Sequence, residues 1–318
     1  MKDILLITPP FTQLNTPYPA TAYLKGFLNT KNISTFQMDL GIEVILELFS
    51  KKGLADIFCH IERSRDASPI THHPSPNTQR IYSLKDDYIK TIDSVIAFLQ
   101  GKSPSLARQI CSGNFLPEAS RFEQLDDMEF AFGSMGMQDK AKHLATLYLE
   151  DLSDFIVECV DENFGFSRYA ERLGRSANSF DELYQNLQKE LTFIDKITIK
   201  ILKVRIERVK PKLVLISVPF PGNLYSAFRC AQFIKANYPE IKISMGGGFP
   251  NTELRELKDN RVFEFFDFIT LDDGELPVEL VYNFVTSSEV EMPLKRTFLL
   301  ENNQVIYKSN STRHDYKQ

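Results

Sequence analysis

The stretch from Lys212 to Pro250, KLVLISVPFPGNLYSAFRCAQFIKANYPEIKISMGGGFP, decides the fold of this chain. An apolar run predicts a buried strand that ends at Ser217, helical spacing follows over Leu224–Asn237, and a second strand leads into Gly246–Gly248. The carboxyl ends of both strands then lie at one edge of a parallel sheet, where open α/β sheets bind their ligands. Glycine has no Cβ and lets a ligand approach the backbone closely. A binding site is therefore predicted at this edge.

The same residues also permit structural interpretations. The three glycines could form a tight turn that packs strand against helix, and Ser217 could cap a loop. Further along, Gly274-Glu275 could be the first turn of a helix, where an acidic side chain is favoured by the helix dipole.

The flanking sequence extends the strand and helix alternation in both directions. Upstream, a strand at 4–8 stops at Pro9-Pro10, a helix covers 20–29, and a strand at 33–38 ends at Asp39. Downstream, helix 251–257, strand 266–271 and helix 276–285 complete the pattern. The prediction is a five-stranded, parallel, doubly wound α/β sheet of the flavodoxin or Rossmann type.

The domain organisation follows from a long gap in the strand pattern. Residues 42–209 show helical spacing, including a stripe from Leu144 to Cys159, and are expected to form a helical insertion. The α/β domain is then discontinuous, at 1–41 and 210–290. Residues 291–318 are expected to form a β-hairpin that turns at Asn302-Asn303, followed by a linker.

Composition limits the class of protein. The chain has 318 residues, 43% of them hydrophobic, with a net charge of −5 and a pI near 5.7. This balance offers no broad basic surface for nucleic acid. Apolar runs are too short to span a membrane, and four dispersed cysteines indicate reduced thiols. We expect a soluble cytoplasmic protein with no nucleic-acid or membrane partner.

Taken in order, the strand ends resemble the N-terminal cobalamin (vitamin B12)-binding domain of radical S-adenosylmethionine (SAM) proteins. The resemblance covers 1–41 and 212–285 and implies cofactor-binding residues at each strand end. These residues are Thr8, Pro9, Pro10, Asp39, Ser217, Pro219, Gly246, Gly247, Gly248, Phe249, Gly274 and Glu275. No residue of this chain is expected to be catalytic or to bind a metal.

Two departures refine this expectation. The loop Pro9–Asn15 has no histidine where the general cobalamin signature has one, so base-off, histidine-off cobalamin is expected. The chain also lacks the CxxxCxxC loop that holds a four-iron cluster. SAM and a 4Fe-4S cluster are expected only in a missing catalytic domain in cis, of which this chain would be a truncated fragment.

The sequence is compatible with three functions. The first is the cobalamin-binding module of a radical SAM enzyme that performs methyl transfer or related radical chemistry, with this chain alone not catalytic. The second is a non-catalytic, flavodoxin-like nucleotide- or flavin-binding sensor module, which needs a phosphate-binding loop after the first strand. The third is an interaction protein built on the helical insertion.

Overall fold

A seven-stranded sheet organises the first of two compact units. The computed structural model describes residues 3–14, 18–67, 74–123, 136–175, 180–287 and 293–309. The expected linker is therefore described only up to 309, and Asn15 also lies outside these ranges. The two units comprise Met1–Val44 with Phe166–Gln318, here called the sheet unit, and Ile45–Gly165, here called the helical unit.

The sheet has the order β2-β1-β3-β4-β5-β6-β7. Its first five strands pair in parallel, whereas β6 and β7 pair antiparallel. The strands are β1 (Ile4–Thr8), β2 (Thr35–Asp39), β3 (Leu213–Ser217), β4 (Lys242–Gly246), β5 (Phe268–Thr270), β6 (Thr297–Glu301) and β7 (Gln304–Lys308).

The hairpin differs from the expectation because it is part of the sheet. Asn302 and Asn303 both adopt positive φ, of 49° and 61°, which confirms the expected turn. However, Ile269 of β5 pairs with Phe298 of β6, so the hairpin extends the sheet instead of standing beside it. The resulting sheet has seven strands, not five.

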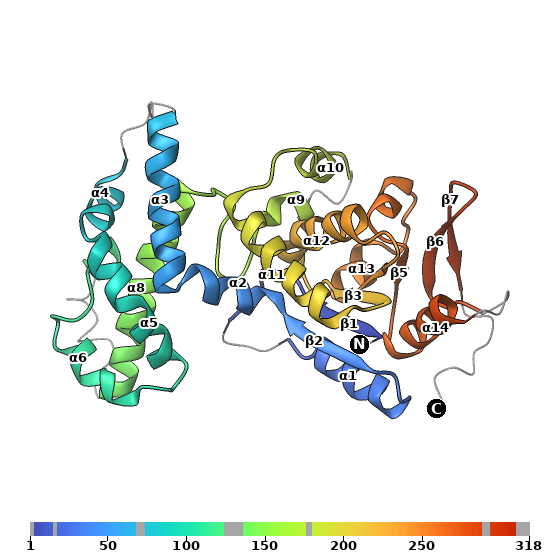
Figure 1. Ribbon diagram of the computed structural model, residues 1–318, viewed down its shortest axis with the longest axis horizontal. Coiled ribbons are helices and arrows are strands. Elements are labelled where there is room, and N and C mark those ends of the chain that lie inside the picture. Colours follow the sequence, from blue (N-terminus) through green and yellow to red (C-terminus); the bar gives the residue numbers. More distant parts are fainter. Residues whose placement is uncertain are drawn as a thin grey trace. The chain divides into compact units, whose positions relative to one another are not determined.

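Helices cover both faces of this sheet (Figure 1). The helices of the sheet unit are α1 (Ala20–Thr30), α2 (Leu40–Leu48, which crosses the unit boundary), α9 (Glu171–Arg175), α10 (Asp181–Leu187), α11 (Phe193–Val209), α12 (Leu224–Asn237), α13 (Gly248–Glu253) and α14 (Glu275–Thr286). Two 3-10 turns, η4 (Pro221–Asn223) and η5 (Asn260–Glu264), follow β3 and α13. Helices α1 and α14 lie on one side of the sheet, and α11 and α12 lie on the other.

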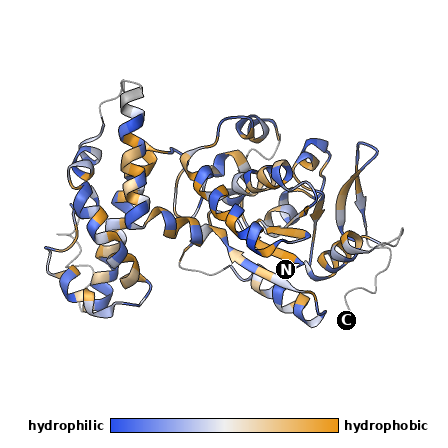
Figure 2. Ribbon diagram, viewed as in Figure 1, coloured by the Kyte–Doolittle hydropathy of each residue, from blue (hydrophilic) through white to orange (hydrophobic). Residues whose placement is uncertain are grey.

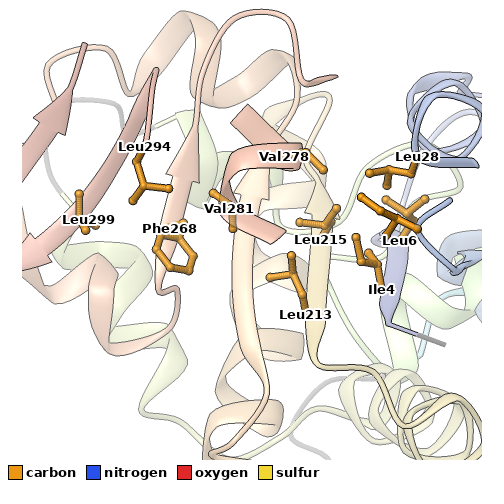
Figure 3. Close-up of a cluster of buried hydrophobic side chains, with 11 residues drawn as sticks. Ile4, Leu6, Leu28, Leu213, Leu215, Phe268, Val278, Val281, Leu294 and Leu299 are labelled. Atoms are coloured by element: carbon orange, nitrogen blue, oxygen red, sulfur yellow. The ribbon is translucent and has the colours of Figure 1, made fainter. Parts of the chain in front are cut away.

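One hydrophobic core lies between the sheet and the α1/α14 layer. Figure 3 shows Leu6 of β1 and Leu215 of β3 beneath Leu28 of α1 and Val278 of α14. The strands at the centre of this unit are mostly hydrophobic in Figure 2. This pattern is typical of parallel strands that are covered on both faces.

Two features of the predicted insertion differ from the sequence-based division. Helices α9 to α11 belong to the sheet unit, although 42–209 was expected to form a single insertion. Helical spacing was also expected throughout 42–209, a range that includes 188–192. Instead, α10 ends at Leu187, and α11 begins after Thr192. The Thr192 hydroxyl oxygen accepts a hydrogen bond from the N–H of Asp195, and the N–H of Thr192 donates to the Asp195 carboxylate.

The helical unit is built around one long helix. Its helices are α3 (Lys51–Ala67), α4 (Pro76–Ser83), α5 (Lys85–Leu99), α6 (Ala107–Cys111) and α8 (Met137–Cys159), with 3-10 turns η1 (Pro104–Leu106) and η2 (Ser120–Phe122). The predicted stripe of α8 is buried from Leu144 to Ile156. Asp151 of α8 is also buried, and its carboxylate accepts hydrogen bonds from the backbone N–H groups of Ala119 and Arg121.

Candidate functional site

Hydroxyl groups line the carboxyl edge of the sheet on the face covered by α1 and α14. Strand register pairs Leu215 with Ser244 and Ser217 with Gly246. Because side chains alternate between faces, every second residue of neighbouring strands shares this face. The last row at the edge contains Thr8, Ser217, Gly246 and Thr270, and the row beneath it contains Leu6, Leu215, Ser244 and Phe268.

A narrow cleft of about 40 Å³ opens between these rows and the two helices. Thr21 and Leu24 of α1 form one wall, and Gly274 and Val278 of the α14 region form the opposite wall. The strand ends supply the floor, with Leu6, Leu215, Ile216, Ser217, Ser244, Gly246, Gly247, Thr270 and Asp272. The cleft has room for a few water molecules and not for a cofactor as it stands.

Hydrogen bonds engage most of the hydroxyl groups around the cleft. Thr8 Oγ1 lies 3.4 Å from Thr21 Oγ1, which also accepts a 3.0 Å hydrogen bond from Gln37 Nε2. The Thr270 hydroxyl donates to the carbonyl of Met245 at 3.3 Å. Ser244 Oγ, by contrast, is buried and has no hydrogen-bond partner among the described residues. An unpaired buried hydroxyl costs about 1–3 kcal/mol, which makes Ser244 the polar group in the cleft most in need of a partner.

The segment Gly246–Gly248 at the end of β4, here called the glycine loop, packs directly on the loop after β3. The N–H of Val218 donates to Gly246 O at 2.7 Å, and the N–H of Phe249 donates to Val218 O at 3.0 Å. A Cβ on Gly247, whose φ is +107°, would lie 2.7 Å from Val218 O, and one on Gly248 would lie 2.7 Å from Pro219 O. The glycines therefore allow the two loops to touch, and Gly246 and Gly247 also border the cleft.

The loop after β1 is held by Asn223, which follows the neighbouring strand β3. Asn223 is fully buried, and its Nδ2 donates to the carbonyls of Pro9 at 2.9 Å and Phe11 at 2.8 Å. Pro9 and Pro10 have no N–H group to offer. The carbonyls of Pro9 and Phe11 are therefore already paired, and the first two residues after the strand have no N–H group to offer a phosphate.

Asp39 and Glu275, two of the predicted site residues, lie at the beginnings of α2 and α14. Asp39 Oδ1 accepts a 3.0 Å hydrogen bond from the N–H of Ile42 at the beginning of α2. Burial raises the pKa of Asp39, against the opposing effect of the backbone hydrogen bonds. Glu275 lies in the first turn of α14, and its hydrogen bond with Tyr23 raises the pKa of that tyrosine. Neither carboxylate lines the cleft.

The predicted residues thus divide between the cleft and its surroundings. Ser217, Gly246, Gly247 and Gly274 line the cleft, and Thr8 adjoins it through Thr21. Phe249 lines a separate groove on the other side of the glycine loop.

Sequence reasoning missed three hydroxyl residues of the cleft, Thr21, Ser244 and Thr270. A signal existed for Ser244, because it is a polar residue in the middle of an apolar strand. Thr270 ends its strand in the same way as Thr8 and could have been found by that parallel.

No family model matches this chain, and no curated protein shows significant similarity to it. Within the described ranges, no group of three or more His, Cys, Asp or Glu side chains could hold a metal ion. In the same part of the chain, no helix is long and apolar enough to cross a membrane.

Proposed function

We propose that the sheet unit is a cobalamin-binding module, with the corrin at the carboxyl edge and the nucleotide tail in the cleft under α1 and α14. The observation that carries this proposal is the unpaired, buried Ser244 hydroxyl beneath a row of hydroxyl residues and glycine. The parallel strands also follow the flavodoxin-like order 2-1-3-4-5, with the reversal of order between β1 and β3. Ligands of such sheets bind at that reversal.

The chemistry of the cleft suits a nucleotide tail. Leu6, Leu24 and Val278 offer apolar contacts to a flat aromatic base, and Ser217 and Ser244 offer hydrogen bonds to polar atoms of the tail. Gly246 and Gly247 keep this edge free of side chains.

The volume of the cleft adds a requirement to the proposal. A pocket for a ligand of this size needs about 300 Å³ or more, so α1 and α14 must separate before the tail can enter. Two surface contacts link these helices: an ion pair of 3.1 Å between Lys31 and Glu279, and the Tyr23–Glu275 hydrogen bond. An exposed ion pair such as Lys31–Glu279 contributes about 0–1 kcal/mol and opposes separation only weakly.

The residues of this unit would bind and orient the cofactor. The base-off, histidine-off state expected from the sequence of the loop after β1 is part of this proposal. When bound, the cobalt would supply the ability to carry a methyl group. A radical SAM domain in cis, with SAM and a 4Fe-4S cluster, and methyl transfer by the longer protein, are part of the same proposal.

The test compares cobalamin with cobinamide, which has the corrin but no nucleotide tail. The purified chain is mixed with hydroxocobalamin or with cobinamide and passed through gel filtration, and the visible spectrum of the protein peak is recorded. We expect retained cobalamin with a base-off spectrum, and weaker retention of cobinamide. Ser217→Ala should weaken cobalamin binding about 2- to 10-fold, the effect of one hydrogen bond, and Ser217→Leu should abolish it by filling the cleft.

Two controls make this result specific to the cleft. Ser112→Leu, at an exposed position of the helical unit, should bind cobalamin normally. Circular dichroism should show that Ser217→Leu keeps the secondary structure of the wild type. Failure of the wild type to retain any corrin would count against the proposal, and so would unchanged cobalamin binding by a folded Ser217→Leu protein.

The flavodoxin-like alternative receives less support from the loop after β1. Flavin or nucleotide phosphates are bound by free N–H groups, often at a helix N-terminus. Pro9 and Pro10 provide none, and the Pro9 carbonyl is already occupied by Asn223.

A further inference from the structure

A second and larger cavity lies in the sheet unit beside α13. This groove has a volume of about 680 Å³, within the range of small-molecule sites. It is bordered by α9 and α10, by the beginning of α12, and by the segment from α13 to η5. It shares no lining residue with the cleft, although both adjoin the loop between β4 and α13.

The floor of the groove is apolar and aromatic. Leu224 and Phe228 of α12 and Leu183 of α10 are buried, and Phe180 packs on Phe228 with ring centroids 5.2 Å apart. Phe249 of α13 completes this floor. Such a floor favours a ligand with an aromatic or branched aliphatic group.

Specific contacts fix the walls. The Arg261 guanidinium pairs with Asp259 at 2.6 Å on its own segment and with Asp181 of α10 at 2.7 Å. It also lies 5.5 Å from the centre of the Phe180 ring. On the other side, a Cβ on Gly174 of α9 would lie only 2.5 Å from the carbonyl oxygen of Pro221. These contacts hold the segments around the groove in place.

Charges on the rim leave a negative excess. Arg255 pairs with Asp272, and Asp259 is neutralised by Arg261. In the described part of the chain, Glu253, Glu256 and Lys258 form no ion pair or hydrogen bond through their side chains, and all three are exposed. Among the described side chains that line the groove, two free carboxylates and one free ammonium group leave an excess of one negative charge, which favours a positively charged ligand.

We propose that this groove is a second binding site, for a small apolar molecule that carries an amine. The aromatic floor receives the apolar group, and the carboxylates of Glu253 and Glu256 attract the ammonium. The inference does not depend on cobalamin binding, because it rests on a different cavity and on different side chains.

The test uses two naphthalene probes of opposite charge, 2-(1-naphthyl)ethylamine and 1-naphthylacetic acid. Saturation-transfer NMR detects binding, and calorimetry measures the affinity. We expect the amine to bind with a dissociation constant below about 1 mM and the acid to bind at least threefold more weakly. Thr252→Trp, on an exposed residue of the groove, should weaken amine binding at least tenfold by filling the space.

Matched variants separate the groove from the general surface. The double change Glu253→Gln and Glu256→Gln should weaken amine binding three- to tenfold and leave acid binding unchanged or stronger. Ala236→Trp and Glu240→Gln, at exposed positions outside the groove, should have no effect. The proposal is overturned if the amine does not bind at 1 mM, if Thr252→Trp binds it normally, or if both probes bind equally well.

Discussion

The cleft and the groove are two cavities of one α/β unit, and their volumes differ more than tenfold, about 40 against 680 Å³. The smaller one contains hydroxyl groups, and one of them, that of Ser244, is buried without a partner in the described part of the chain. The larger one has an aromatic floor and a rim of exposed charges. By volume alone, the groove would be the main site, whereas the buried, unpaired hydroxyl of Ser244 favours the cleft. A small cavity can therefore be the more informative one, because an unpaired buried hydroxyl has an energetic cost that a ligand can remove.

The glycine loop separates the two cavities, so its disruption should have the largest effect. Gly247→Ala places a Cβ against Val218 O and forces alanine into a φ of +107°. We expect a loss of about 3 kcal/mol in the free energy of unfolding, from strain together with the clash. Denaturant titration measures this value.

Gly26→Ala, in the interior of α1, is the matched control. A Cβ at Gly26 meets no atom within 4 Å, and alanine is favoured over glycine inside a helix. This variant should be more stable than the wild type by about 0.5–1 kcal/mol. If Gly247→Ala were as stable as Gly26→Ala, the proposed loop packing would be wrong.

A substitution at Ser244 tests whether the unpaired hydroxyl lowers stability and contributes to binding. Ser244→Ala removes the unpaired hydroxyl, so the chain without ligand should gain about 1 kcal/mol while cobalamin affinity falls. Thr270→Val removes a hydroxyl that is already bonded to Met245 O, and should lose about 0.5–1.5 kcal/mol. Calorimetric unfolding of both variants shows whether each substitution raises or lowers the stability. A loss of stability in Ser244→Ala would show that its hydroxyl is satisfied.

Arg261 tests the rigidity of the groove. Arg261→Met keeps much of the side-chain length but removes the charge, and should reduce the free energy of unfolding by about 1 kcal/mol at neutral pH. The hydrogen bond from Arg261 lowers the pKa of Asp259 below its usual 3.8. This stabilisation is fully present above about pH 4 and is lost as the pH falls through the lowered pKa.

The difference in stability between wild type and Arg261→Met should therefore shrink in acid. Thermal unfolding at a series of pH values from 2 to 7 measures it. A difference that stays constant over this range would show that Arg261 does not stabilise the protein through the charge of Asp259.

Local patterns in the sequence were enough to predict much of the sheet. Apolar runs that end at Thr8, Ser217 and Gly246 gave the strands, because parallel strands buried on both faces need continuous hydrophobic sequence. Pairing between β5 and β6 was not predictable in this way, since the hairpin pattern is the same for a free hairpin and for one that extends a sheet.

The candidate site was predicted less completely. The sequence indicated that Gly247 needs space, but not whether a ligand or the Val218 backbone occupies it. The groove was missed altogether, because its floor joins Phe180 and Phe228, which only tertiary packing of α10 on α12 brings together. Such contacts leave no periodic signal in the chain.

The smallest expected effect concerns the closure of the cleft. Lys31→Ala removes the 3.1 Å ion pair with Glu279 that links α1 to α14. Both side chains are partly exposed, so the free energy of unfolding should fall by less than about 1 kcal/mol. If the helices must separate before the cofactor tail enters, the same change should accelerate cobalamin association up to about fivefold in stopped-flow absorbance, because a population shift of 1 kcal/mol corresponds to that factor.

Two comparisons show whether such an acceleration comes from opening of the cleft. Cobinamide association should be unaffected by Lys31→Ala, since it has no tail to admit. Lys52→Ala, which breaks an exposed ion pair with Asp56 in the helical unit, should change neither rate. Equal acceleration of both corrins would indicate altered surface electrostatics, whereas a selective effect on cobalamin would make α1 and α14 the barrier to entry. The groove, which is already open, has no corresponding barrier, so the rate of amine binding there should be the same in Lys31→Ala and in the wild type.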